Sequence, residues 1–285
     1  MRLTSVHKLL LICLGALVFR LILLQFVHFP GIADPNHYYN LGVRLVEGHG
    51  FTIDYIWQYN DTYPTLVHPD DYWMPLTGVL PAASMALFGI GVTQALLPFV
   101  LLGSLLPIIG YWAVRQFGAE TSSALFAAAV VAVLPEFVLN SVRTDTTIPN
   151  ALLLGAAILF LTDGLKRGRW LNFAASGVML GLAYLTRSEN LLMLVMFVMT
   201  LGLYVLLKQP SRWRMALLVP LIAVLIAVPW SLRNIALNGT LSTPTTSNMF
   251  FLTDYLDHYF YDRHLTLEGY LASQSIGQII GKRLF

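Results

Sequence analysis

Long apolar runs separated by short polar segments make up most of the chain. A helix needs about 17 or more apolar residues to cross a bilayer. Seven runs meet this length, at residues 9–28, 92–114, 122–140, 148–164, 170–186, 190–207 and 213–232. A shorter apolar stretch at 75–89 contains two prolines, and we expect a re-entrant or surface-lying helix there. The pattern predicts an all-α, polytopic membrane bundle of about seven spans.

Composition supports an integral membrane protein. Of the 285 residues, 56% are hydrophobic and only 11% are charged, whereas soluble domains carry about 25% charged residues. Runs this long indicate helices rather than a barrel. The single cysteine, Cys13, excludes a disulfide within the chain and a cysteine-type metal cluster. The formal charge of +2 says little about partners; the lipid bilayer is expected and no nucleic acid is.

The distribution of Lys and Arg predicts the orientation. If 75–89 does not cross, every basic cluster between spans falls on the side of the N-terminus, as the positive-inside rule requires. These clusters are Arg115; Lys166, Arg167 and Arg169; and Lys208, Arg212 and Arg214. We therefore expect a cytoplasmic N-terminus, a multi-pass protein of the cell membrane, and a long outer loop at 29–91.

Two modules are predicted. Residues 1–240 form the membrane module, and 241–285 begin an extracytoplasmic region that stops without a closing element. We expect the chain to be truncated at its C-terminus. Inside the first run, Arg20 either extends to the membrane surface or faces a polar cavity in the bundle. The sequence leaves both open.

Asp34 stands in "ADPNHYY", a few residues after the first run. One interpretation is that it caps a helix that begins at Pro35. The other is that its carboxylate acts as a general base at the membrane surface. Both can hold together. Residues 36–51 have apolar positions at helical spacing and predict an amphipathic surface helix.

Other polar clusters fall on the predicted outer face. His68, Asp70 and Asp71 precede Trp73 in a spacing that does not identify a metal site. A divalent metal is possible but not indicated, and no cofactor is certain. Aromatic residues there also suit a membrane-interface belt.

Three arginines lie at the outer ends of predicted spans. Arg143 precedes Asp145, Arg187 precedes Glu189, and Arg233 follows the last span. Each is either a structural anchor, ion-paired where a carboxylate is near, or a ligand for phosphate oxygens, which arginine suits well.

The order of these segments resembles the GT-C superfamily of membrane glycosyltransferases, which includes protein O-mannosyltransferases and aminoarabinose transferases. The segments are "ADPNHYYNLGVRLVEGHGF", "YWMPLTGVLPAASMALFG", "RTDTTIPNALLL", "LTRSENLLML" and "PWSLRNIALNG". The resemblance covers nearly all of residues 1–240 and rests on order and topology, because no single motif is strict.

This resemblance implies catalytic roles for Asp34 and Asp145. Two departures are visible: Pro35 replaces the second acid of an Asp-Glu pair, and Ser188 replaces the proline of Leu-Thr-Arg-Pro-Glu. Family members also have more spans and a C-terminal region. The implied reaction moves a sugar, with inversion, from a polyprenyl-phosphate-linked donor to a hydroxyl of a glycan, lipid or protein acceptor on the extracytoplasmic face.

The same resemblance suggests binding roles. Donor phosphate would be bound by Arg143, Arg187 and Arg233. Substrate would be bound by His37, Tyr38, Tyr39, His68, Trp73 and Glu189. The alternative is a transporter or a lipid-carrier-binding protein without catalysis. Transporters usually contain inverted repeats and broken helices near the midplane, and the sequence gives no sign of such a pairing.

Overall fold

The computed structural model describes residues 3–57, 65–206, 213–239, 260, 267–275, 277–278 and 281. The described chain is mostly helical, as the apolar runs predict. Lys208 and Arg212 of the third basic cluster lie outside the described residues, as does most of the region predicted at 241–285.

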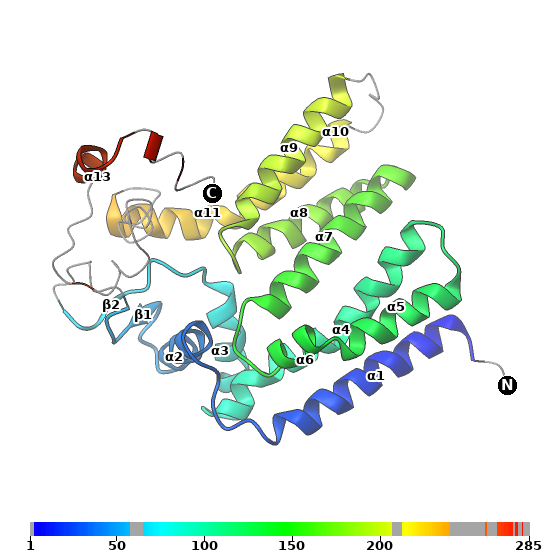
Figure 1. The fold of residues 1–285 in the computed structure, drawn as a ribbon, viewed down its shortest axis with the longest axis horizontal. Coiled ribbons are helices and arrows are strands. Elements are labelled where there is room, and N and C mark those ends of the chain that lie inside the picture. The colour runs from blue at the N-terminus through cyan, green and yellow to red at the C-terminus, as the bar shows by residue number, and fades with distance from the viewer. Residues whose placement is uncertain are drawn as a thin grey trace. The chain divides into compact units, whose positions relative to one another are not determined.

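The elements follow one another as Figure 1 shows. The helices are α1 (Ser5–Leu24), α2 (Asp34–Val46), α3 (Leu76–Phe88), α4 (Val92–Gln116), α5 (Thr121–Val133), α6 (Pro135–Asn140), α7 (Thr147–Arg167), α8 (Trp170–Tyr184), α9 (Asn190–Leu206), α10 (Trp213–Ala216), α11 (Leu218–Asn238) and α13 (Leu267–Ser273). The strands are β1 (Thr52–Ile53) and β2 (His68–Pro69).

The chain divides into two compact units. The helical unit comprises Met1–Gly50 and Met74–Pro229. The loop unit comprises Phe51–Trp73 and Trp230–Phe285.

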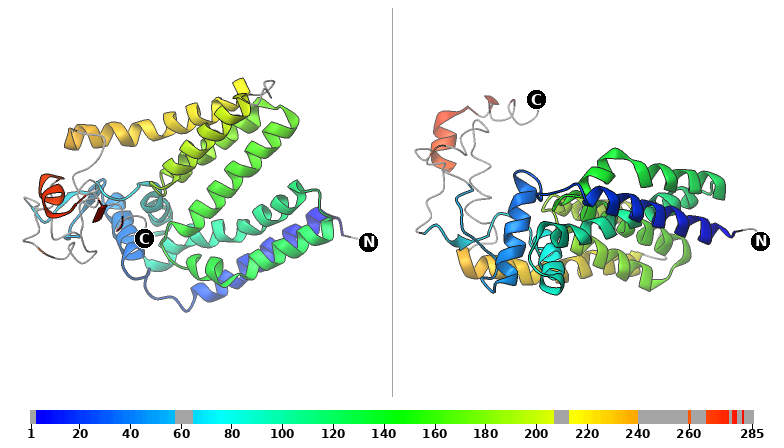
Figure 2. Two further views of the ribbon diagram at one scale, coloured as in Figure 1. Left: turned by 45° about the horizontal axis from the view of Figure 1, so that its top comes forward. Right: turned by 90° about the horizontal axis from the view of Figure 1, so that it is seen from below.

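The helical unit is built around α4. This helix packs against α1, α3, α5 and α7, and α7 packs in turn against α8 (Figure 2). One buried cluster joins α1 to α4 through Leu24, Leu96 and Val100. Many large apolar side chains on α1 and α9 are exposed in the protein alone. Continuous apolar exposure of this kind fits contact with lipid.

In the part of the chain that the structure describes, four helices are long and apolar enough to cross a membrane: Ser5–Leu24, Val92–Gln116, Thr147–Arg167 and Trp213–Leu237. The apolar helices at Leu76–Phe88, Thr121–Val133, Trp170–Tyr184 and Asn190–Thr200 are shorter. The membrane-bundle class is confirmed at this coarser level. The count of seven spans and their orientation stay predictions.

The run at 122–140 is two helices rather than one. Helix α5 ends at Val133, Leu134 is extended with a ψ of 120°, and α6 begins at Pro135. Proline has no N–H to donate and disfavours helical geometry in the preceding residue. The break therefore follows from Pro135. The carbonyls at the end of α5 lose their partners within the helix.

The two helices predicted within the first outer loop are present as α2 and α3. Helix α2 buries one face, which includes His37, Tyr38 and Leu41, and it packs against α3. Leu41 approaches Gly78 of α3 so closely that a Cβ at Gly78 would lie 2.5 Å from its side chain. The pairing fixes α2, and with it Asp34, on the helical unit.

The loop unit contains a small sheet that the sequence pattern does not predict. Strands β1 and β2 pair antiparallel, with Thr52 opposite Pro69 and Ile53 opposite His68. Two residues per strand are too few to show an alternating pattern of apolar and polar positions.

Candidate functional site

Asp34 is the first residue of α2, and the expectation that it caps this helix is wrong. Ala33 occupies the N-cap position, and no side chain makes a capping hydrogen bond. Asp34 lies within the first turn, where a carboxylate interacts favourably with the helix dipole without bonding the backbone as a cap does.

The backbone before Asp34 is unusual. Ala33 has a φ of 62°, and it is the only non-glycine residue with positive φ in the described part of the chain. Gly31 has a φ of 123°, and a Cβ there would lie 2.5 Å from the Cβ of Pro35. Strained backbone of this kind persists only where the surroundings fix it, and it is concentrated at functional sites. The turn presents Asp34 at a defined position.

Asp145 is the second carboxylate of the site. It follows the α6 segment and precedes α7, and its Oδ1 accepts hydrogen bonds from the backbone N–H and the hydroxyl of Thr147, both at 2.8 Å. Asp145 thus bonds the first residue of α7, from the position before the N-cap residue Thr146. The two predicted catalytic carboxylates are close enough for the charge of Asp145 to act on Asp34.

Thr144 connects the two segments that carry these carboxylates. Its side chain is fully buried. Its backbone N–H donates to the carbonyl of Pro30 at 3.3 Å, and its hydroxyl donates to the carbonyl of Pro35. The sequence does not single out Thr144, because a threonine in "VRTDTT" gives no sign of a partner 109 positions away.

The environment changes the acidity of Asp34. Partial burial raises the pKa of its carboxyl above the ordinary value, and the negative charge of Asp145 raises it further. His37, Arg187 and the backbone N–H of Asp34 act in the opposite direction and lower this pKa. The result is a carboxylate with greater affinity for a proton than an exposed aspartate has, which suits a general base.

Arg187 supplies a cation beside the two carboxylates. One Nη donates to Glu189 at 3.0 Å, and the other donates to the hydroxyl of Thr146 at 3.4 Å. The hydrogen bond to Glu189 raises the pKa of the guanidinium and lowers the pKa of the Glu189 carboxyl. This ion pair is largely exposed, so it contributes at most about 1 kcal/mol to folding. An incoming anion can therefore compete for Arg187.

A buried polar network fixes the turn that carries Arg187. The side-chain amide of Asn190 donates to Asn150 at 2.6 Å and to the carbonyl of Ala183 at 2.8 Å. Thr186 donates to the same carbonyl at 2.6 Å. The sequence does not single out Asn150, Thr186 or Asn190. The pattern "LTRSEN" after an apolar run offered only a weak signal, namely polar residues at the end of a predicted span.

Other predicted residues of the helical unit differ in exposure. His37 and Tyr38 are 1% exposed, and their rings meet edge to face at 5.3 Å. Tyr39 is half-buried and Arg143 is exposed. Tyr38 lies near enough to Arg187 to interact with its charge. Stacking on a sugar ring therefore suits Tyr39 better than Tyr38.

Arg233 belongs to the loop unit, where it is held firmly. It donates to the carbonyl of Phe51 at 2.9 Å and to Asn234 at 3.2 Å. Its guanidinium lies 4.3 Å from the centre of the Trp230 ring, a cation–π contact. Asp70 and Asp71 are close enough to attract its charge.

Trp73 and His68 also lie in the loop unit. The Trp73 ring packs edge to face against Trp57 at 5.3 Å and against Tyr72 at 4.7 Å. His68 is buried, with Nδ1 2.9 Å from the carbonyl of Leu66. Across the residues that the structure describes, no three His, Cys, Asp or Glu side chains are arranged to hold a metal ion.

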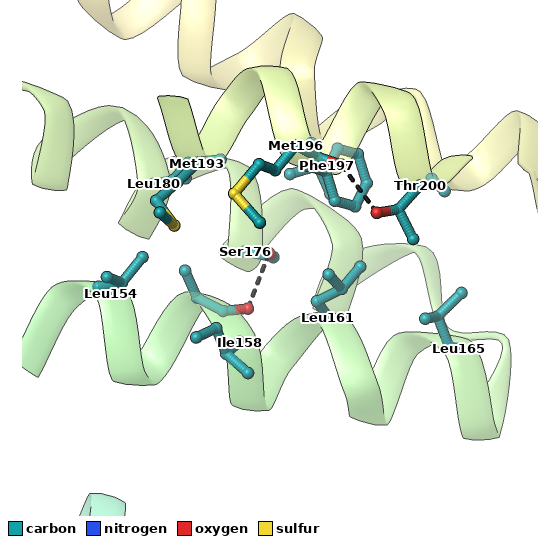
Figure 3. A pocket seen from close by; sticks show the side chains of 13 residues that line it. Leu154, Ile158, Leu161, Leu165, Ser176, Leu180, Met193, Met196, Phe197 and Thr200 are labelled. Atoms are coloured by element: carbon teal, nitrogen blue, oxygen red, sulfur yellow. Dashed lines mark hydrogen bonds between the residues drawn. The ribbon is translucent and has the colours of Figure 1, made fainter. Parts of the chain in front are cut away.

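The helical unit also contains an apolar cavity of about 250 Å³ (Figure 3). It lies among α7, α8, α9, the end of α10 and the start of α11, and Leu154, Leu180 and Met196 are among its lining residues. The hydroxyls of Ser176 and Thr200 both donate to helix carbonyls, at 2.8 Å each. The cavity therefore offers mostly hydrocarbon surface, and these two residues leave no free hydrogen-bond donor in it.

Comparison with known proteins identifies the family. The dolichyl-phosphate-mannose-protein mannosyltransferase family matches residues 67–232, more than half of the chain. The match includes Asp145 and Arg187 and begins after Asp34. No curated protein and no solved structure matches the chain. The chain belongs to the dolichyl-phosphate-mannose-protein mannosyltransferase family and is a membrane glycosyltransferase of the GT-C type.

Proposed function

We propose that the protein transfers a sugar, with inversion, from a polyprenyl-phosphate-linked donor to an acceptor hydroxyl on the extracytoplasmic face of the cell membrane. The family is described by a dolichyl-phosphate-mannose donor and a protein acceptor. A mannosyl donor and a serine or threonine hydroxyl are therefore the first substrates to test.

One observation carries the proposal: Asp34 lies beside Asp145 and Arg187 in a partly buried site. A transferase of this kind needs a base for the acceptor proton and a cation for the departing phosphate. Asp34 supplies the base, since burial and Asp145 raise its proton affinity. Arg187 supplies the cation, because its present partner Glu189 is an exposed carboxylate that a phosphate can replace.

The reaction balances as a single displacement. The acceptor oxygen forms a bond to the anomeric carbon while the bond from that carbon to the phosphate oxygen breaks. The acceptor proton passes to Asp34, and the electron pair leaves with the phosphate, whose charge Arg187 stabilises. Attack on the face opposite the leaving group inverts the anomeric centre.

The donor lipid needs an apolar environment within the membrane. The cavity among α7, α8 and α9 is lined by hydrocarbon and lies in the same unit as Asp34. We assign it to part of the polyprenyl chain. Arg143 and Arg233 are further candidates for the phosphate, and Tyr39 and Trp73 are candidates for the sugar ring.

The test is transfer in proteoliposomes with radiolabelled dolichyl-phosphate-mannose and a threonine-rich peptide. We expect Asp34→Asn to lower the rate of transfer by about 10²–10⁴-fold, the usual contribution of a general base. Glu47→Gln is the matched control, since it neutralises an exposed carboxylate at the other end of α2. It should retain the wild-type rate.

Donor binding separates the possible outcomes. Retained binding with lost transfer in Asp34→Asn supports the assignment. Full transfer by Asp34→Asn would show that another group is the base. Binding of the donor without transfer by the wild type would favour the lipid-carrier-binding alternative.

A further inference from the structure

Arg20 is a buried arginine inside membrane-spanning α1, and the proposed reaction does not use it. Its side chain is 0% exposed, and it lies four residues before the end of the helix at Leu24. It faces the interior of the helical unit rather than the membrane surface, which resolves the two interpretations that the sequence left open. An arginine at such a depth is costly and is retained only for a reason.

The first reason is the break between α5 and α6. Nη1 of Arg20 donates to the carbonyl of Ala132 at 2.9 Å and to that of Ala16 at 3.2 Å. In a continuous helix the Ala132 carbonyl would accept from the N–H four residues later, but Pro135 interrupts the ladder. Arg20 satisfies this orphaned carbonyl at the negative end of α5.

The second reason is Ser141, at the end of α6. Nε of Arg20 donates to the Ser141 hydroxyl at 2.9 Å, and that hydroxyl donates to the carbonyl of Phe137 at 2.5 Å. Gly103 of α4 leaves the space for this contact, because a Cβ there would collide with the Ser141 hydroxyl. Ser141 is therefore held among α1, α4 and α6.

These bonds close a ring that includes both catalytic segments. The chain runs from Arg20 to Pro30, whose carbonyl accepts from the Thr144 N–H. It returns from Thr144 to Ser141, which accepts from Arg20. Asp34 follows Pro30 by four residues, and Asp145 follows Thr144 directly.

We propose that Arg20, acting through Ser141, is a positioning residue that holds the Asp145 segment beside Asp34. The importance of Arg20 for sugar transfer rests on the proposed function, but the geometry of its hydrogen bonds does not. Without the bond from Arg20 to Ser141, the segment 141–146 is still held by the hydrogen bonds of Thr144. It loses its contact with Arg20 at Ser141. Asp145 then moves away from Asp34.

A change in the pKa of Asp34 would reveal this movement of Asp145. The groups that act on it are Asp145, His37 and Arg187, and Glu189 is paired with Arg187. When Asp145 moves away, a repulsive charge is lost, and Asp34 gives up its proton at lower pH. Because unfolding would also return the pKa of Asp34 to its lower ordinary value, the shift is read only in variants whose midpoint of thermal unfolding equals that of the wild type.

The experiment measures protonation of Asp34 without measuring transfer. Carbodiimides react with protonated carboxyls, so the extent of Asp34 labelling against pH, read by mass spectrometry on the full chain in nanodiscs, gives its midpoint. We expect Ser141→Ala and Arg20→Met to shift the midpoint to lower pH, in the direction of the Asp145→Asn reference.

Ser104→Ala is the matched control. Ser104 is also a buried serine whose hydroxyl donates to the carbonyl four residues earlier, Val100, at 2.7 Å. Its hydroxyl accepts no bond from Arg20. The pH midpoint of Asp34 labelling in Ser104→Ala should equal that of the wild type.

Two results would overturn the proposal: an unmoved midpoint in Ser141→Ala, or an equal shift in Ser104→Ala. The Ser141 variant removes one oxygen and keeps the test decisive if Arg20→Met fails to fold. A shifted midpoint in these variants, together with a wild type that transfers no sugar, would refute the proposed function and leave the positioning role intact.

Discussion

At the scale of single residues, neighbouring groups shift the pKa of Asp34 in opposite directions. Burial and Asp145 raise its pKa, while His37 and Arg187 lower it. A base works only when deprotonated, so the rate should fall as pH drops through the pKa of Asp34 in the free enzyme. A raised pKa places this acid limb at higher pH than an exposed aspartate would.

The pH profile of kcat/KM tests this balance with two substitutions of opposite sign. Asp145→Asn removes the repulsive charge, so the acid limb should move to lower pH. Arg187→Gln removes the attractive charge, so the limb should move to higher pH, and kcat/KM should also fall by about 10²-fold because the leaving phosphate loses its cation. Movement in the same direction for both variants would show that Asp34 does not define the limb.

The folded state should respond to Asp34 in a defined way as well. The folded pKa is raised above the unfolded one, so Asp34 favours the folded state at pH values below the unfolded pKa. This contribution is lost as pH rises through the folded pKa. Asp34→Asn removes the buried charge, and its midpoint of thermal unfolding at neutral pH should equal or exceed that of the wild type. A markedly lower midpoint would mean that the transfer assay of this variant reports unfolding.

The sequence points to the carboxylates and to Arg20 as an unusual charge. It does not show which groups Arg20 and Thr144 contact. Asp34, Asp145 and Arg187 stand out because charged residues at the ends of apolar runs are few. Thr144 and Arg20 act on groups more than a hundred positions away. Such contacts depend on how helices pack, which an apolar run does not specify.

At the scale of elements, α8 and α11 approach each other closely. Gly177 and Gly181 of α8 are four residues apart, the spacing of a small-xxx-small interface. A Cβ at Gly177 would lie 2.8 Å from the carbonyl oxygen of Val219, and one at Gly181 would lie 3.0 Å from that of Ala223. The obstacle in each case is backbone, which cannot rotate away.

Gly177→Ala should therefore destabilise the helical unit, by about 1–3 kcal/mol, the usual cost of overpacking. Gly202→Ala is the matched control on α9, where an added Cβ meets nothing within 4 Å. That variant should be neutral or slightly more stable, since alanine favours helix over glycine. The measurement is the midpoint of thermal unfolding of each purified variant. Equal midpoints would contradict the close approach of α8 and α11.

The boundaries of the helices show what an apolar run does not predict. The runs at 9–28, 92–114 and 148–164 correspond to α1, α4 and α7. The run at 122–140 was as apolar as these, yet Pro135 divides it. Hydropathy measures transfer into lipid and does not register a missing N–H, so local proline chemistry determined the outcome.

At the scale of the whole helical unit, the two ends of α7 differ in chemistry. Asp145 accepts a hydrogen bond from the first residue of α7, and Lys166 and Arg167 lie in its last turn. A helix of 21 residues is about 30 Å long, the thickness of the hydrocarbon core. Lys166 donates to the carbonyl of Gln116 at 2.5 Å, so the last residues of α4 and α7 lie together. The basic residues thus gather at the end away from Asp145.

This separation predicts an orientation that labelling can measure. In a Cys13→Ser background, single cysteines at Glu47, Phe117 and Ser188, all exposed, would be treated with a membrane-impermeant maleimide in right-side-out vesicles. Under the positive-inside rule we expect Glu47→Cys and Ser188→Cys to react in intact vesicles and Phe117→Cys to react only after permeabilisation. Ser188 is the critical position, because its side depends on the shorter helices α5 and α8 both crossing. Protection of Ser188→Cys with labelling of Glu47→Cys would mean that one of these helices stays on one side, and Arg187 would then be separated from the extracytoplasmic face on which transfer is proposed.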